Sequence, residues 1–151
     1  MPDYKYNEQV DIENIKKLRT MLSELPAFFK DFFRGIEPRT QSRTRIAYAY
    51  DIKIFLQFLL EENPSIKKSY TNLTDIPISV LESLTVTDIE EYMEYLKYRD
   101  TDGKKISNKE NAIKRKISTL KSVFKYFYRT EKLSENIMER VQLPKLHSKE
   151  I

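Results

Sequence analysis

The sequence SNKENAIKRKISTLKSVFKYFYR, residues 107–129, decides the fold, because it predicts one long amphipathic helix. Its apolar residues recur at steps of three and four, which places them on one face of a helix with about 3.6 residues per turn. We expect this face to be buried as a single stripe made of Ile113, Ile117, Leu120, Phe124 and Phe127. The opposite face alternates cations with short polar side chains, namely Asn111, Arg115, Ser118, Ser122 and Arg129.

The polar face has two interpretations. A solvated face usually pairs Glu with Lys four residues apart, whereas small side chains flanked by Arg let a helix approach a phosphate backbone or a groove. The charge distribution bears on the choice, since residues 104–151 hold thirteen Lys or Arg against five acids, and residues 61–103 hold four against ten. This separation suggests a polyanionic partner for the basic end, with a solvated basic helix as the alternative.

Composition excludes several classes of protein. The chain has no Cys and a single His, His147, so we expect no disulfide, no metal site and no cofactor. We find no glycine-rich phosphate loop and no catalytic constellation, and Tyr48, Tyr92 and Tyr128 suit core positions. No apolar run approaches the roughly eighteen residues of a membrane helix, and the N-terminus lacks a signal-peptide pattern. We therefore expect a cytoplasmic protein without a membrane partner or a small-molecule substrate.

Helical patterns also occupy most of the chain before residue 107. The second of them is rich in Phe, and we expect it to pack on the main domain or on a partner. Residues 64–86 read as a connector that contains one short helical turn. The expected helices therefore make the fold all-α, and they cover residues 11–25, 26–33, 40–62, 79–84 and 87–99.

Polar residues at the helix starts predict caps and one anion site. Thr87 and Glu90 match a capping box, and other candidate caps are Thr40, Ser42, Thr44, Ser107 and Asn108. Arg39, Arg43 and Arg45 surround the start of the helix of residues 40–62, where unpaired backbone N–H groups and the positive end of the helix dipole favour an anion. Arg and Thr also precede helices that bind nothing, so both interpretations stay open.

Residues 44–59, residues 84–96 and the stretch that ends in Leu143, Pro144 and Lys145 follow one another in a characteristic order. This order resembles the N-terminal core-binding domain of the tyrosine recombinases, the phage-integrase and Xer-like family. The chain differs from this family at two positions. Lys121 stands where the family often has Arg, and Ile137, directly after Asn136, stands where the family usually has Pro. Weaker matches lie in residues 44–59 and 84–96. The strongest match is to the family pattern R-x-L-S-x-L-R-x-F-Y-x-Y-L … N-P … V-x-x-P-K, through Arg115, Ile117, Ser118, Leu120, Phe124, Phe127, Asn136, Val141, Leu143, Pro144 and Lys145.

The resemblance implies a small orthogonal, SAM-like bundle of four main helices that clamps duplex DNA for recombination or integration. It implies an N-terminal extension of residues 1–38, a core-binding domain of residues 39–146, and in residues 147–151 the start of a linker to a catalytic domain, which we expect to be absent. This fragment should then lack catalytic activity and bind double-stranded DNA beside other protomers. A helical module that binds an acidic protein is the alternative. The expected DNA contacts are Arg39, Ser42, Arg43, Thr44, Arg45, Asn108, Asn111, Arg115, Ser118, Lys121, Ser122 and Lys125.

Overall fold

The computed structural model describes residues 3–98 and 106–143, with side chains described in residues 6–98 and 109–143. Every secondary-structure element assigned within these ranges is a helix, so the all-α prediction is confirmed. The chain divides into two compact units, Met1–Val80 and Leu81–Ile151. The predicted extension of residues 1–38 therefore lies in the same unit as the start of the predicted core-binding domain.

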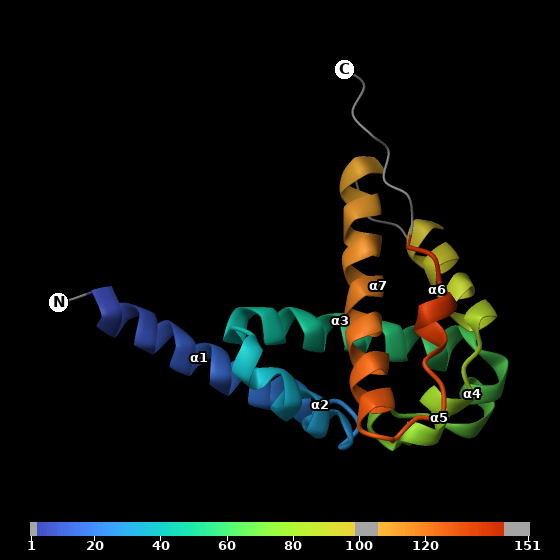
Figure 1. Cartoon of the computed structure of the whole chain (residues 1–151), viewed down its shortest axis with the longest axis horizontal. Helices are drawn as coiled ribbons and strands as arrows, with labels where there is room; N and C mark the ends of the chain where they lie inside the picture. The colour runs from blue at the N-terminus through green and yellow to red at the C-terminus, as the bar shows by residue number, and fades with distance from the viewer. Residues whose placement is uncertain (1–2, 99–105, 144–151) are drawn as a thin grey trace. The chain divides into compact units, whose positions relative to one another are not determined.

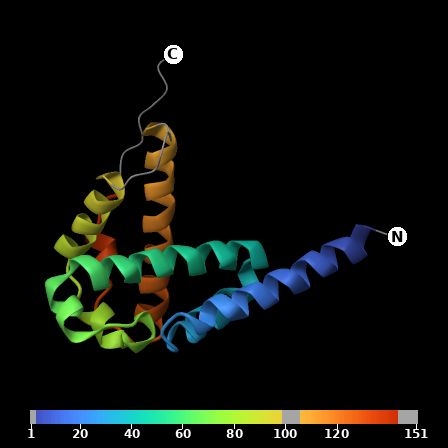
Figure 2. The same ribbon diagram turned by 180° about the vertical axis from the view of Figure 1, so that it is seen from behind.

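The first unit is built on α3 (Ser42–Glu62), against which the second half of α1 (Asp3–Ser23) packs. The two helices run in the same direction, and the first part of α1 extends beyond the start of α3 (Figure 1, Figure 2). On α3, Ile52, Phe55 and Leu59 lie on one apolar face and are buried. The other helices of this unit are α2 (Phe29–Ile36), η1 (Glu37–Arg39), α4 (Pro64–Ser69) and η2 (Leu73–Asp75).

The Phe-rich segment forms the core of the first unit, as one of its two interpretations predicted. Phe29, Phe32 and Phe33 are almost fully buried, and the Phe32 ring lies 6.2 Å from the ring of Tyr48 on α3. The helix also continues beyond its predicted end at residue 33. Ile36 explains the extension, because it lies one turn after Phe32 and Phe33 and is completely buried.

Two elements of the first unit were wrong or missing in the sequence interpretation. Helix α1 begins at Asp3, eight residues before the predicted start. Helix α4 lies in the segment that was interpreted as the start of a connector. Asn63 and Pro64 end α3 and also start α4, because the Asn63 side chain accepts a hydrogen bond from the Ile66 N–H at 3.2 Å and Pro suits the first position of a helix.

In the second unit, α6 (Val86–Tyr98) and α7 (Ile106–Arg129) pack through their apolar faces. The stripe that decided the fold is confirmed, since none of its five residues is more than 6% exposed. Ile89, Tyr92 and Leu96 of α6 are also buried. A short helix, η3 (Ile137–Arg140), follows α7, and α5 (Ile78–Ser83) contains the boundary between the units.

The helix caps differ from those predicted. The reciprocal capping pair of α6 lies two residues before the predicted one, since the Thr85 N–H donates to Asp88 at 2.8 Å and the Asp88 N–H donates to the Thr85 hydroxyl at 3.3 Å. For α3 the N-cap is Gln41, without a side-chain bond, so the three candidate caps at its start were wrong. The candidates Ser107 and Asn108 stand inside the first turn of α7, and their side chains lie outside the described residues.

The end of α7 contains a residue in a left-handed conformation. Glu131 has φ of 64°, and the chain closes the helix there by hydrogen bonds from the Lys132 and Leu133 N–H groups to the Phe127 carbonyl. Gly is the usual residue at such a position, because a Cβ atom clashes with the backbone there. The chain beyond it is held in the second unit by Leu133, Met138 and Val141, which are buried.

Substitution of Glu131 by Gly is expected to stabilise the protein by about 0.5–1 kcal/mol, because it removes the Cβ clash at positive φ. Thermal unfolding should show this as a rise in Tm of about 2 °C. The control is Glu131→Ala, which removes the charge but keeps Cβ and should leave Tm near that of the wild type. An equal gain in both variants would contradict the backbone explanation.

Candidate nucleic-acid interface

The exposed face of α7 is basic. Described side chains on this helix, residues 109–129, include seven Lys or Arg and one acid, Glu110. Of the contacts predicted from the sequence, Asn111, Arg115, Ser118 and Lys125 are exposed, whereas Lys121 and Ser122 are half-buried. Lys114 is exposed beside them, one turn before Ser118 and three turns before Lys125 on the same face. Sequence reasoning missed Lys114, although the same helical spacing identifies it.

The other large helix of this unit carries the opposite charge. Glu90, Glu91 and Glu94 of α6 are exposed. Both helices bury their apolar faces in the same unit, so their charged faces point to solvent and remain distinct. A polyanion would be attracted to α7 and repelled by α6, which gives the second unit one favourable face for such a ligand.

The Arg-rich start of α3 separates into exposed and buried residues. Arg39 and Arg43 are exposed, and Thr44 is half-buried. Arg45 is only 7% exposed, and its guanidinium donates to the Thr40 carbonyl at 2.6 Å, to the Thr40 hydroxyl at 3.1 Å and to the Glu37 carbonyl at 3.3 Å. These bonds fasten η1 to α3. Arg45 therefore has a structural position that its sequence context did not indicate.

Ser42 also lies inside the first unit, at 5% exposure. Its hydroxyl accepts a hydrogen bond of 3.2 Å from the Asn14 side chain of α1. Of the five predicted contacts at the start of α3, the structure therefore presents Arg39, Arg43 and Thr44 to solvent and encloses Ser42 and Arg45. Asn108 cannot be placed in the same way, because its side chain lies outside the described residues, as do His147 and the family residues Pro144 and Lys145.

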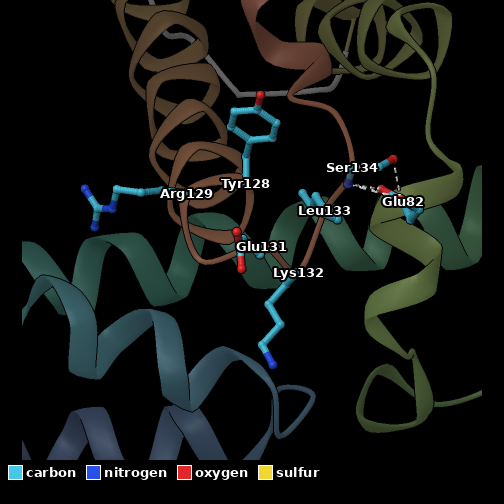
Figure 3. Close-up of a pocket in the computed structure, with 7 residues that line it drawn as sticks. All are labelled: Glu82, Tyr128, Arg129, Glu131, Lys132, Leu133 and Ser134. Carbon is cyan, nitrogen blue, oxygen red and sulfur yellow. Dashed lines mark hydrogen bonds between the residues drawn. The ribbon is translucent and has the colours of Figure 1, made fainter.

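An open hollow of about 620 Å³ lies at the end of α7 (Figure 3). On one side, the Ser134 N–H and hydroxyl both donate to the Glu82 carboxylate, at 3.1 Å and 2.6 Å. Figure 3 shows Arg129 and Lys132 pointing in different directions, so the hollow does not gather its cations around one ligand. Tyr128 lines it and is 47% exposed, which makes its predicted core position wrong; it lies about 100° round the helix from buried Phe127.

Comparison with known proteins identifies relatives. The chain is 28% identical over 123 residues to tyrosine recombinase XerC of Caldanaerobacter subterraneus subsp. tengcongensis, covering 78% of this chain and 33% of that protein. It is 26% identical over 147 residues to tyrosine recombinase XerS of Lactococcus lactis subsp. lactis, covering 89% and 39%. A tyrosine recombinase of Pseudothermotoga lettingae is 30% identical over 118 residues, covering 78% and 34%. The chain is a relative of the tyrosine recombinases.

The resemblance to tyrosine recombinases that was inferred from the sequence is thus confirmed. The chain spans between 33% and 39% of the length of the curated recombinases it matches. No protein-family model matches the chain, and no solved structure matches it. Within the described part of the chain, no helix is long and apolar enough to cross a membrane.

Proposed function

We propose that this chain is the DNA-binding, core-binding part of a site-specific tyrosine recombinase, and that it clamps duplex DNA in the cytoplasm for recombination or integration. The observation that supports this most strongly is the exposed basic face of α7, in a unit whose acidic residues on α6 form a different surface. Duplex DNA is the polyanion that suits both this charge and the recombinase relatives.

The two kinds of side chain on α7 suit two kinds of contact. Lys114 and Lys125 would bind phosphates, which position a protein on DNA without reading its sequence. Arg115 lies between small polar neighbours, Ser118 and Asn111, so its guanidinium is the better candidate for a base edge in the major groove. In the first unit, we propose that Arg39, Arg43 and Thr44 contact phosphates of the same duplex.

The recombinase reaction itself is not proposed for this chain alone. The relatives are matched over only about a third of their length, and we expect strand cleavage to need residues beyond those matched here. Other recombinase protomers bound to the same DNA are the proposed protein partners.

Salt dependence of binding tests the proposal. A fluorescently labelled duplex of about 30 base pairs and arbitrary sequence would be titrated with the protein at several salt concentrations. If about five phosphates are neutralised, log K should fall with log salt with a slope of about −4 to −5. Absence of binding at low salt, or binding insensitive to salt, would overturn the proposal. A stable complex with an acidic protein in place of DNA would instead support an interaction module.

A further inference from the structure

Two contacts show how α1 is aligned with α3. The Asn14 side chain donates to the Ser42 hydroxyl at 3.2 Å near the start of α3, and Lys53 pairs with Glu24 at 3.4 Å about three turns later. The two pairs are separated by ten residues along α1 and the turn after it, and by eleven on α3, so the helices run parallel and nearly in step. Residue 17 of α1 is therefore level with the first turn of α3.

The Glu24–Lys53 pair also identifies one exposed side of the two helices. Glu24 stands in the turn directly after α1, where its N–H bonds to the Met21 carbonyl at 3.0 Å and continues the winding of the helix. Lys17 precedes Glu24 by seven residues, or two turns, and so points to the same side. On α3, Tyr50 is one turn before Lys53, and Arg43 is two turns before Tyr50. Because Glu24 and Lys53 meet on this side, helical geometry places the other three residues there as well. Lys17 and Arg43 are exposed, and Tyr50 is 57% exposed.

We propose that Lys17 and Arg43 bind phosphates of the same DNA duplex. The Tyr50 hydroxyl donates a hydrogen bond to a phosphate on the same side of the two helices. The proposal rests on the proposed DNA-binding function and extends it to α1, which lies before the motifs that carry the family resemblance. Packed helices lie about 8–10 Å apart, so Lys17 and Arg43 can reach separate phosphates of one backbone.

The charges on this side favour DNA only in part. Glu24 is neutralised by Lys53, whereas Glu13 lies one turn before Lys17 on the same side of α1. The attraction of Lys17 and Arg43 for phosphate is thus opposed by one nearby carboxylate, that of Glu13. Removal of that carboxylate should strengthen binding, which gives the surface a test of opposite sign.

The chain offers a matched control for Lys17. Lys16 is its neighbour and is also exposed, but it lies about 160° from the buried Leu18 that faces α3, and so points away from the pair of helices. Both substitutions to Gln remove one positive charge from the same helix. A difference between them therefore reports position and not net charge.

Binding of the same arbitrary duplex at several salt concentrations tests the inference. Lys17→Gln should weaken binding about fivefold and reduce the magnitude of the salt slope by about 0.9, whereas Lys16→Gln should leave the slope unchanged. Tyr50→Phe should weaken binding without changing the slope, because the hydroxyl is neutral. Glu13→Gln should strengthen binding.

The outcomes separate this inference from the proposed function. If the wild-type protein binds with the expected salt slope but Lys17→Gln and Lys16→Gln behave alike, α1 is not part of the interface and the inference is wrong. If the wild-type protein does not bind DNA, the proposed function itself fails. Thermal unfolding of each variant should match the wild type, because all four side chains are on the surface, and a large fall in Tm for Lys17→Gln would also contradict the inference.

Discussion

Replacement of Arg45 by Ala is expected to lower the free energy of unfolding by about 2–4 kcal/mol, the largest effect among the polar residues considered. The guanidinium is buried and donates to two carbonyls and one hydroxyl, in Glu37 and Thr40. Its loss leaves these acceptors in a partly buried position without a donor, and it also removes the packing of the aliphatic stem.

Thermal unfolding measures this effect, and Tm should fall by about 10 °C. Arg45→Lys should recover only part of the loss, because an ammonium group cannot reproduce the planar fork of donors. The matched control is Arg43→Ala, which removes the same charge two residues earlier from an exposed position. Arg43→Ala should keep the wild-type Tm and weaken DNA binding. The opposite pattern, with Arg45→Ala stable and defective in binding, would make Arg45 a DNA ligand.

Joint replacement of Lys114, Arg115 and Lys125 by Gln should have the largest effect on DNA binding. Loss of the two proposed phosphate contacts of Lys114 and Lys125 should make the salt slope less negative by about 1.8. With the base contact of Arg115 also removed, affinity at low salt should fall on the order of 100-fold. Because all three side chains are exposed on α7, the Tm of this variant should stay near that of the wild type.

The control for this variant removes three charges elsewhere. Lys67, Lys68 and Lys97 are exposed on α4 and α6, and their joint replacement by Gln changes the net charge equally. Binding should then weaken by no more than about threefold, since charges that touch no phosphate release no counterions. Equal losses in the two triple variants would show that binding depends on net charge and not on the face of α7.

The long helix was predictable because its pattern is local. Burial of Ile113, Ile117 and Phe124 follows from spacing alone, since any packing partner must cover the one apolar stripe that the helix offers. The polar face then follows by geometry, and the exposure of Arg115 and Lys125 agrees with it. Local capping patterns were less informative. Thr85 and Asp88 form the same kind of motif that was assigned to Thr87 and Glu90, because each pair places a Thr three residues before an acid.

By itself, the sequence determined the all-α class, the buried and polar faces of α7, and the relationship to tyrosine recombinases. Only the tertiary structure decided which residues at the start of α3 are available to a ligand. Arg43 and Arg45 have the same charge in the same local sequence, but the chain from Glu37 to Thr40 folds back over one and leaves the other exposed. Ser42 is enclosed by Asn14, 28 residues away. Helical periodicity determines the direction of a side chain, whereas its exposure depends on which distant segment packs there.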